Sequence, residues 1–420
     1  MKIQQLYDIF TQHPVITTDS RCCPPSSLFF ALKGDSFDGN AYARAAIEQG
    51  CAYAVVDAPQ YADPSDPRYI LVDDVLTTLQ QLATCHRRQL RTTIIAVTGT
   101  NGKTTTKELM AAVLKQKYNV LYTQGNFNNH IGVPKTLLNL RSEHEIAVVE
   151  MGANHPGEIR TLVNIAEPDY GLITNVGKAH LLGFGSFEGV IRTKGELYDY
   201  LRQHGGKAFI NPQNPYLTGI SDGLDTIPYL QGQVIDCKPF MHFQFGEHEV
   251  QTRLIGAYNL DNALAAATVG RYFGVADEAI VGALAAYTPS NNRSQFLQTA
   301  QNQLIVDAYN ANPTSMNAAI SNFREMQAPH KMCILGDMGE LGDVSTQEHQ
   351  RIVDLLSQSD FETVWLVGPN FAQANCPASF RHFTDVEAVK QTLTAEPLNG
   401  HTILVKGSNS TKLYQLPEYL

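Results

Sequence analysis

The sequence predicts an α/β protein of three domains, in which a central parallel-sheet domain is flanked by a smaller domain on either side. The chain has 420 residues, more than one hydrophobic core normally serves. Short apolar runs alternate with segments of helical character along most of its length, as in parallel sheets covered on both faces. Two changes in this pattern, near residues 88 and 288, mark the expected domain boundaries.

The first segment, residues 1–88, is expected to form a small α/β domain. Its apolar runs lie at residues 28–32 and 52–56, among loops rich in Gly, Asp and Pro. Residues 76–91 have helical character and lead directly into a more strongly apolar strand. We therefore expect a helix at the junction with the next domain.

The second segment, residues 89–288, is expected to form the central domain. Continuous apolar runs occur at residues 94–97, 120–122, 146–149 and 171–174. We expect strand and helix to alternate from the first of these runs to about residue 288. In such sheets ligands bind beyond the carboxyl ends of the strands, so polar residues that follow these runs are the candidates for a site.

The third segment, residues 289–420, is expected to form a smaller, Rossmann-like domain. It begins after the turn-forming cluster YTPSNN at residues 287–292, which has the composition of a linker. Beyond the linker, apolar runs return at residues 304–306, 332–335, 364–367 and 403–405. Their alternation with helical segments again predicts an α/β fold.

Composition and charge argue against several classes of protein. The net charge is −10, which is unfavourable for nucleic-acid binding. The N-terminal segment MKIQQLYDIF lacks the apolar core of a signal peptide, and no run is long enough to span a membrane. The seven cysteines include no CxxC pair, so neither a zinc site nor a disulfide framework is expected. We expect a cytoplasmic monomer that does not insert into membranes.

The strongest local signal is the segment VTGTNGKTTT at residues 97–106, which follows an apolar run and precedes a helical pattern. Glycines let backbone N–H groups turn toward phosphate oxygens, and the helix N-terminus adds a favourable dipole. Lys103 is suited to the β- and γ-phosphates and the Thr104 hydroxyl to Mg²⁺. The loop is a shortened form, because Val97 stands where the usual pattern has its first glycine. The alternative is a glycine turn with an ordinary surface lysine.

The phosphate loop leads us to expect a P-loop ATPase domain at the centre of the chain, although the motif alone does not distinguish kinases, GTPases, ATPases and ligases. A GTPase would need a base-reading N/T-K-x-D motif, which is absent. The residues expected to contact ATP in this loop are Gly99, Thr100, Asn101, Gly102, Lys103, Thr104 and Thr105.

Three further residues are candidates for the same site. Glu150 ends an apolar run, where it could bind a metal or cap a helix. His180 lies in NVGKAHL, just past the next run, and a lone histidine is more often structural than a ligand. Lys194 lies in TKGE, at the expected start of a helix near Thr193, where a lysine is usually solvated. The three carry weight only together with the phosphate loop.

Taken together, these motifs resemble those of the Mur ligases along nearly the whole chain. The resemblance rests on GTNGKTTT, VVEMGANHPGEI, NVGKAHLLGFGS, RTKGELY, GAYNLDNALAA, the Arg293 region, VDAYNANPTSM, ILGDMGELG and LVKGSNS. It implies an ATP-dependent ligase that transfers the γ-phosphate of ATP to a peptide carboxylate, so that an amine can attack the resulting acyl phosphate.

Within the family, the segments GNFNNHIGVPKTLLNL, GANHPGEI, DAYNANPTSM and GDMGELG resemble the member that adds D-alanyl-D-alanine to a UDP-N-acetylmuramoyl-tripeptide. The first alternative is the ligase that adds the third amino acid to the UDP-N-acetylmuramoyl-dipeptide, but its Asp-Asn-Pro-Arg motif is absent. An alternative of another class is a P-loop regulatory protein that hydrolyses ATP without forming a bond.

Two positions depart from the family's usual motifs. Tyr258 replaces the histidine of a G-x-H-N motif, and Asn40 replaces the histidine of an Asp-Gly-His motif. These departures concern the adenine contacts and the uridine pocket rather than the metal centre.

The resemblance also implies individual roles. Lys103, His180 and Lys194 would be catalytic. Thr104 and Glu150 would hold one Mg²⁺, while His180 and a carbamylated Lys194 would serve a second. Further ATP contacts are implied for Asn262, Arg293 and Asp307. Contacts to the UDP-muramoyl substrate or the acceptor are implied for Ser20, Arg21, Asn129, Asn310, Asn312 and Lys406, although the segment around Ser20 and Arg21 could equally be a simple turn.

Overall fold

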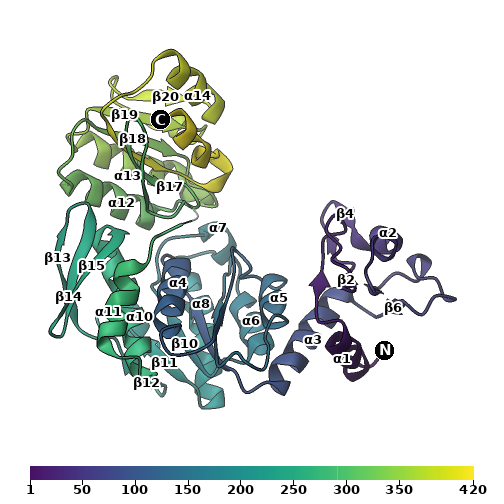
Figure 1. Ribbon diagram of the computed structural model, residues 1–420. Helices are drawn as coiled ribbons and strands as arrows, with labels where there is room; N and C mark the ends of the chain where they lie inside the picture. Colours follow the sequence, from purple (N-terminus) through teal and green to yellow (C-terminus); the bar gives the residue numbers. More distant parts are fainter. Residues whose placement is uncertain (291) are drawn as a thin grey trace.

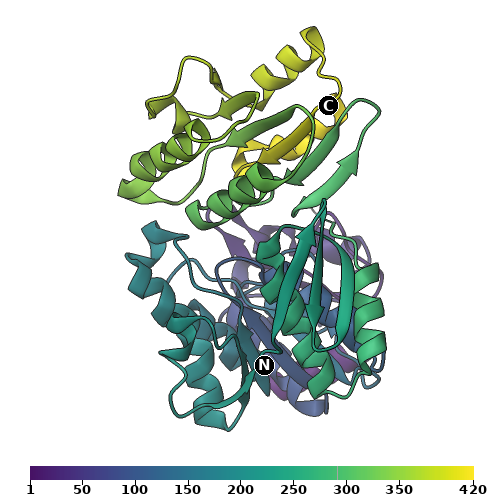
Figure 2. The ribbon, with the colours of Figure 1, turned by 90° about the vertical axis from the view of Figure 1, so that its left-hand side faces the viewer.

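Three α/β units follow one another along the chain of the computed structural model, which describes residues 1–290 and 292–420. In Figure 1 the C-terminal unit lies above the central unit and the N-terminal unit lies to its right. Figure 2 shows the same stacking of the C-terminal unit on the central one from the side. Among the described residues, no helix is both long and apolar enough to cross a membrane.

The N-terminal unit contains a four-stranded parallel sheet in the order β1-β2-β5-β6. The strands are β1 (Ile16–Thr17), β2 (Leu28–Phe30), β5 (Tyr53–Val56) and β6 (Tyr69–Leu71), with a small antiparallel pair β3 (Lys33–Gly34) and β4 (Phe37–Asp38). The helices are α1 (Ile3–Gln12), η1 (Gly39–Tyr42), α2 (Ala43–Glu48), η2 (Pro59–Tyr61) and α3 (Val75–Gln89).

Helix α3 joins this unit to the central one. Asp74 caps its N-terminus by accepting a hydrogen bond from the Thr77 backbone at 2.6 Å. Its buried residues, such as Leu79 and Leu82, belong to one apolar cluster that continues into α5 and α6. The expected helix at the junction is confirmed. Because its buried residues belong to a core that the two units share, it is a structural part of both.

The central unit is built on a six-stranded parallel sheet in the order β12-β11-β10-β7-β9-β8. Its strands are β7 (Thr93–Thr98), β8 (Val120–Tyr122), β9 (Ile146–Glu150), β10 (Tyr170–Ile173), β11 (Lys207–Ile210) and β12 (Asp225–Pro228). The helices are α4 (Lys103–Leu114), α5 (Gly132–Leu137), α6 (Glu158–Ala166), α7 (Leu181–Phe184), α8 (Phe187–His204), α9 (Pro215–Thr218), η3 (Ala257–Asn259), α10 (Leu260–Tyr272) and α11 (Asp277–Ala286). Strands β7 and β9 lie side by side. The phosphate loop follows β7, and Glu150 is the last residue of β9.

The expected alternation of strand and helix up to residue 288 is wrong between residues 232 and 255. There the chain forms an antiparallel sheet of β13 (Gly232–Cys237), β14 (Phe240–Phe245) and β15 (His248–Ile255). Every second side chain of β14 is buried. This period of two is the signature of a strand with one buried face, and the sheet packs it against α10 and α11.

The expected start of a helix at Thr193 is also wrong. Helix α8 begins at Phe187, because the Ser186 hydroxyl caps it by accepting from the Gly189 backbone at 3.1 Å. Thr193 and Lys194 therefore lie in the helix interior, where both side chains are buried. Burial changes the chemistry open to Lys194.

The C-terminal unit has a six-stranded sheet in the order β16-β17-β21-β18-β19-β20, parallel except for β16. The strands are β16 (Gln295–Gln298), β17 (Gln303–Asp307), β18 (Lys331–Gly336), β19 (Thr363–Val367), β20 (Arg381–Phe383) and β21 (Thr402–Lys406). The helices are α12 (Pro313–Glu325), η4 (Gly342–Val344), α13 (Ser345–Ser357), η5 (Phe371–Gln373), α14 (Val386–Ala395), η6 (Asn409–Thr411) and η7 (Leu413–Tyr419). Separate apolar clusters cover its two faces. Asn291 of the expected linker lies outside the described residues.

Candidate active site

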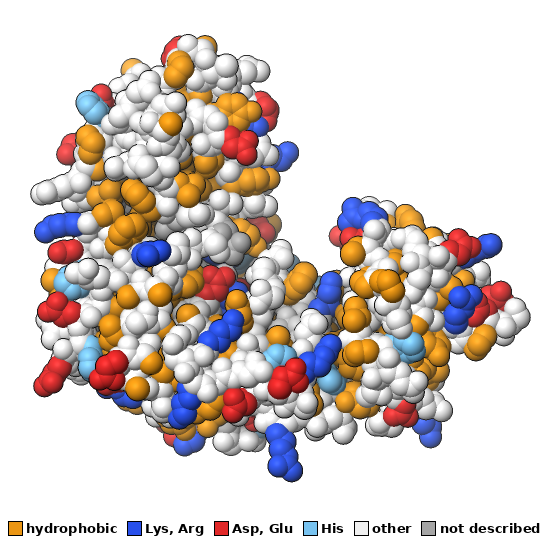
Figure 3. Space-filling view, in the orientation of Figure 1, with side chains coloured by type: hydrophobic (Ala, Val, Ile, Leu, Met, Phe, Trp, Pro, Cys, Tyr) orange, Lys and Arg blue, Asp and Glu red, His pale blue; other side chains and the backbone are white. Residues whose placement is uncertain are grey.

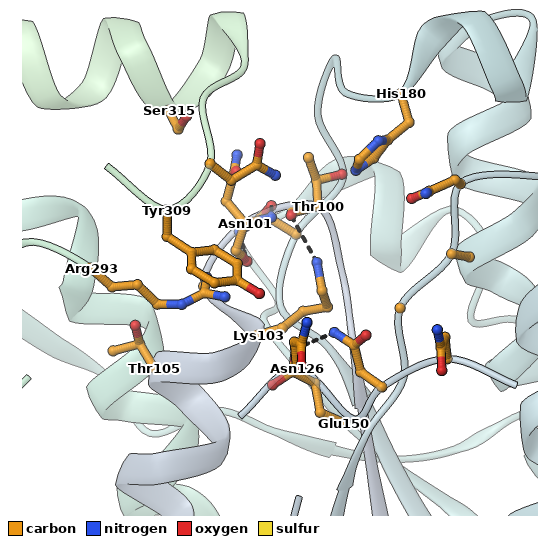
Figure 4. Close-up of a pocket in the computed structure, with 18 of the residues that line it drawn as sticks. Thr100, Asn101, Lys103, Thr105, Asn126, Glu150, His180, Arg293, Tyr309 and Ser315 are labelled. Atoms are coloured by element: carbon orange, nitrogen blue, oxygen red, sulfur yellow. Dashed lines mark hydrogen bonds between the residues drawn. The ribbon is translucent and has the colours of Figure 1, made fainter. Parts of the chain in front are cut away.

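A cavity of about 810 Å³ lies where the carboxyl ends of β7 and β9 face the C-terminal unit. Its lining comes from all three units: Leu76 and Gln80 of α3, the phosphate loop, and Asp307 and Lys406 at the ends of β17 and β21. The space-filling view shows the surface hollowed between the N-terminal and C-terminal units (Figure 3). Figure 4 shows the polar side chains that converge on the cavity.

The phosphate loop runs from the end of β7 into α4, and two glycines make its shape possible. Gly102 has φ +77°, and a Cβ there would lie 2.5 Å from the Asn262 side-chain oxygen. Gly99 has φ +145°, and a Cβ there would lie 2.0 Å from the Thr174 hydroxyl. A side chain at either position would be strained and would collide with its neighbour, so the tight loop requires both glycines.

Lys103 is the first residue of α4 and reaches back over the loop. Its ammonium donates to the carbonyl of Gly99 at 2.8 Å and to that of Thr100 at 3.0 Å, the second of which is drawn in Figure 4. Burial lowers the pKa of Lys103 to about 8, an effect that nearby Glu150 partly opposes. The ammonium is thus held in the cavity by carbonyl groups and is available to an anionic ligand.

Glu150 ends β9 with its side chain 1% exposed. One carboxylate oxygen accepts from the Thr104 hydroxyl at 3.2 Å and from the Asn128 amide at 2.8 Å. The other oxygen is buried without a hydrogen-bond partner among the described residues, and the Lys107 ammonium lies 3.9 Å from it. A buried carboxylate oxygen without a donor is costly unless a cation binds it. The pair Thr104 and Glu150 therefore fits a divalent cation.

His180 lies on the loop after β10, at the N-terminus of α7, with φ +51°. Its Nδ1 is in hydrogen-bond contact with the Glu340 carboxylate of the C-terminal unit. Burial lowers the pKa of the ring, and Glu340 opposes this. A low pKa favours the neutral imidazole, which is the form that binds metals. Figure 4 shows the ring pointing toward the side of the cavity where Thr100 lies.

Lys194 lies behind the wall of the cavity, 2% exposed. Its ammonium donates one long hydrogen bond, 3.4 Å, to the carbonyl of Ala153, which lines the cavity. It forms no ion pair among the described residues and lies 5.4 Å from the centre of the Phe184 ring. Burial, followed by repulsion from Lys103, lowers the pKa of Lys194 well below its ordinary value. The neutral amine is therefore favoured.

One side of the cavity holds the three residues of α10 and the C-terminal unit that were expected to contact ATP. Asn262 accepts from the Thr106 hydroxyl at 3.0 Å and donates to Asn259 at 2.8 Å. The Arg293 guanidinium stacks on the Tyr309 ring, 3.9 Å from its centre. Asp307 forms an ion pair with Lys406 at 2.6 Å. All three residues line the cavity.

The residues expected to contact the substrates are brought together only in part. Asn129, Asn310 and Lys406 line the cavity. Asn312 joins the units by donating to Asn101 at 2.8 Å. Ser20 and Arg21 do not line the cavity, and the Arg21 guanidinium is paired with Asp19 on the surface.

Several functional candidates escaped the sequence analysis. Asn128 donates to the Glu150 carboxylate at 2.8 Å, whereas the side-chain oxygen of its neighbour Asn129 accepts from the Gly132 backbone at 2.9 Å. Lys107 is 1% exposed and donates to the Thr123 carbonyl at 2.8 Å. Its position one helical turn after Lys103 was the only signal that it faces the sheet. Glu340 lies far from His180 along the chain, and only the packing of the two units brings them together.

Comparison with known proteins agrees with this geometry. Residues 14–89 match the model of the "Mur ligase family, catalytic domain", residues 97–270 the "Mur ligase middle domain" and residues 292–409 the "Mur ligase, glutamate ligase domain". A relative from Bacillus subtilis, named UDP-N-acetylmuramoyl-tripeptide--D-alanyl-D-alanine ligase, is 36% identical over 96% of this chain and 92% of its own. A relative of the same name from Escherichia coli is 34% identical with the same coverage.

Solved structures show the same likeness. A crystal structure of MurF from Acinetobacter baumannii superposes with a TM-score of 0.83 at 32% identity, covering 96% of this chain and 92% of that one. A MurF ligase from Thermotoga maritima in complex with ADP gives a TM-score of 0.86 at 25% identity, covering 100% and 98%. The three family matches and the full-length relatives show that this chain belongs to the Mur ligase family.

Proposed function

We propose that this chain is an ATP-dependent ligase that joins D-alanyl-D-alanine to UDP-N-acetylmuramoyl-tripeptide, with release of ADP and phosphate. The observation that carries the proposal is that the phosphate loop, α3 and the ends of the C-terminal strands all line one cavity. The full-length relatives, which bear the name of this activity, support the choice of substrates.

The reaction needs two chemical steps. The terminal carboxylate of the tripeptide attacks the γ-phosphorus of ATP, and ADP leaves. The amine of the dipeptide then attacks the acyl phosphate, and inorganic phosphate leaves with formation of the amide bond. The first step brings two anions together, so positioning and charge neutralisation contribute most of the rate enhancement.

The cations of the cavity suit that first step. Lys103 would exchange its two loop carbonyls for the oxygens of the transferring phosphate. Arg293, held on the Tyr309 ring, would approach the same phosphate from the C-terminal side. The backbone N–H groups of residues 99–105 and the N-terminus of α4 would hold the remaining phosphate charge.

Thr104 and Glu150 would hold Mg²⁺, as their contact at 3.2 Å and the unpartnered carboxylate oxygen of Glu150 suggest. When bound, the ion would supply positive charge that neutralises the phosphates. Asn128 orients the carboxylate, and Lys107 balances its charge from the other side.

A second metal is proposed beside His180 and Lys194, with Lys194 carbamylated. Carbon dioxide adds to a neutral amine, and burial together with Lys103 favours that form of Lys194. The product is an anion on a long side chain, which could bind a metal where an ammonium would be repelled.

The remaining assignments concern the base, the ribose and the two peptide substrates. Asn262 would contact the adenine and Asp307 the ribose, while Asn310 and Lys406, which line the cavity, would face the acceptor or the tripeptide. Asn312 would serve the same substrates, although it does not line the cavity and donates to Asn101 at 2.8 Å. Asn129 would contact the UDP-muramoyl substrate. Ser20 and Arg21 would bind the same substrate outside the cavity, next to Lys135, whose ammonium donates to Thr18 at 3.4 Å.

A coupled assay of ADP release tests the function. The purified enzyme is offered UDP-N-acetylmuramoyl-tripeptide with D-alanyl-D-alanine, and UDP-N-acetylmuramoyl-dipeptide with free diamino acids. Product formation with the tripeptide and dipeptide pair is expected, and turnover should be nearly absent when either is omitted. Faster turnover with a free amino acid would support the ligase of the preceding step, and ADP release without an acceptor would support a simple ATPase.

A further inference from the structure

The contact between His180 and Glu340 joins two units of the protein at the metal side of the cavity. His180 belongs to the loop after β10 of the central unit, and Glu340 belongs to the loop after β18 of the C-terminal unit. The contact is made by Nδ1 of the ring and one oxygen of the carboxylate. Glu340 is not part of the cavity lining, so it approaches the ring from outside the cavity.

The loop that carries Glu340 is fixed within its own unit. The Gly339 backbone donates to the Ser408 hydroxyl at 2.8 Å, and the Met338 backbone donates to His349 at 3.0 Å. Glu340 itself has φ +59°, an uncommon conformation for a residue other than glycine. This conformation turns its side chain toward the central unit, where its carbonyl also accepts from the Leu182 backbone at 3.4 Å.

A histidine that binds a metal usually donates its second ring nitrogen to a carboxylate or carbonyl. That hydrogen bond selects the tautomer and holds the ring at one angle. With Nδ1–H donated to Glu340, the proton is absent from Nε2, whose lone pair is then free to bind a cation in the cavity. The Glu340 carboxylate is therefore placed where a metal-binding His180 needs an outer partner.

We propose that Glu340 is a positioning residue that completes the second metal site by orienting His180 from the C-terminal unit. The inference rests on the proposed function, in which His180 binds a metal. It adds that this site is complete only when the C-terminal unit is docked on the central one. Docking would thereby couple metal binding to assembly of the cavity that holds ATP and the acceptor.

Another ion pair bridges the same two units and provides a matched control. Lys178 contacts Glu348 of α13 at 3.2 Å and does not contact His180. Its removal weakens the interface without touching the ring. Lys178→Ala therefore reports on docking alone, whereas Glu340→Ala removes both a docking contact and the partner of Nδ1.

The experiment measures binding of Mn²⁺ to the full-length enzyme with a non-hydrolysable ATP analogue, by electron paramagnetic resonance of the free ion. The wild type should bind two ions, and His180→Ala should lose the weaker one. Glu340→Ala should weaken that ion by about 10- to 100-fold, the range typical of outer-partner losses. Glu340→Gln, whose amide oxygen can still accept from Nδ1, should recover part of the affinity. Lys178→Ala, which loses only a docking contact, should weaken binding of that ion much less than Glu340→Ala does.

Two results would overturn the inference while leaving the ligase function intact: wild-type Mn²⁺ binding by Glu340→Ala, or equal losses in Glu340→Ala and Lys178→Ala. Unchanged Mn²⁺ binding by His180→Ala would refute both the inference and the metal role of His180. Failure of the wild type to form product from the tripeptide and D-alanyl-D-alanine would refute the proposed function separately. Thermal unfolding of each variant checks that the fold is intact.

Discussion

Replacement of Lys194 by alanine should abolish most ligase activity, and acetate should restore part of it. Lys194 is 2% exposed and has no ion-pair partner among the described residues. As an ammonium it would be an uncompensated buried charge beside a metal site; as a carbamate it would be an anion suited to that metal. Alanine removes the side chain beside Ala153 and leaves room for a small carboxylate.

The direction of the effect follows from the charges, and the expected size is smaller than their direct interaction. At roughly 4 Å and an effective dielectric constant of about 20, each pair of unit charges interacts by about 4 kcal/mol. Because Mg²⁺ carries two charges, an ammonium at that distance would be repelled by about 8 kcal/mol and a carbamate attracted by a similar amount. These figures are upper limits on the direct electrostatic interaction. Water and phosphate oxygens would replace much of a lost ligand. We therefore expect a loss of about 100-fold in kcat, or about 2.7 kcal/mol.

The assay is ADP release at saturating substrates, with and without about 100 mM acetate, an amount chosen to match weak binding in the millimolar range. Acetate should raise the rate of Lys194→Ala by about tenfold and leave the wild type unchanged. Lys194→Arg is the matched control, because it keeps the positive charge, fills the space and cannot form the same carbamate. A carbon-13 resonance of the carbamate should appear in the wild type under labelled carbon dioxide and be absent from both variants. Near-normal turnover of Lys194→Arg would refute the reasoning.

Two other predictions concern the phosphate loop and its metal. Glu150→Gln should raise the Mg²⁺ concentration needed for half-maximal activity by at least about 100-fold, because it removes the charge of a buried carboxylate. One oxygen of that carboxylate has no hydrogen-bond partner among the described residues and lies 3.9 Å from the Lys107 ammonium. An unchanged Mg²⁺ dependence would contradict the assignment. Affinity for an ATP analogue should fall as the pH rises above 8, because the pKa of Lys103 is lowered to about 8 and the ammonium loses its proton there. Calorimetry should show that the affinity falls by up to about tenfold per pH unit, with proton uptake on binding near pH 8 to 9. An affinity that does not change between pH 7 and about 9.5 would count against this prediction.

Local signals in the sequence determined the parallel sheets. The apolar runs at residues 94–97, 146–149 and 332–335 correspond to β7, β9 and β18, because a strand buried on both faces needs continuous apolar residues. The phosphate loop was equally legible, since its glycines and Lys103 are neighbours in the chain. The antiparallel sheet of β13 to β15 departs from the expected alternation of strand and helix, because a strand with one buried face, such as β14, has apolar residues at every second position instead of a continuous apolar run.

What the tertiary structure alone decided is the set of pairs between distant residues. Asn128 holds Glu150, Lys406 pairs with Asp307, and Glu340 contacts His180. The chemistry of Lys194 likewise depends on the tertiary structure. The sequence pattern predicts a helix that begins near Lys194, whereas α8 begins at Phe187 after the Ser186 cap, and the Lys194 amine is buried. Motifs and strand patterns depend on residues that are neighbours in the chain, so the sequence alone determines them. Burial, pKa values and ion pairs depend on which surfaces pack together, and those contacts form only when the three units assemble.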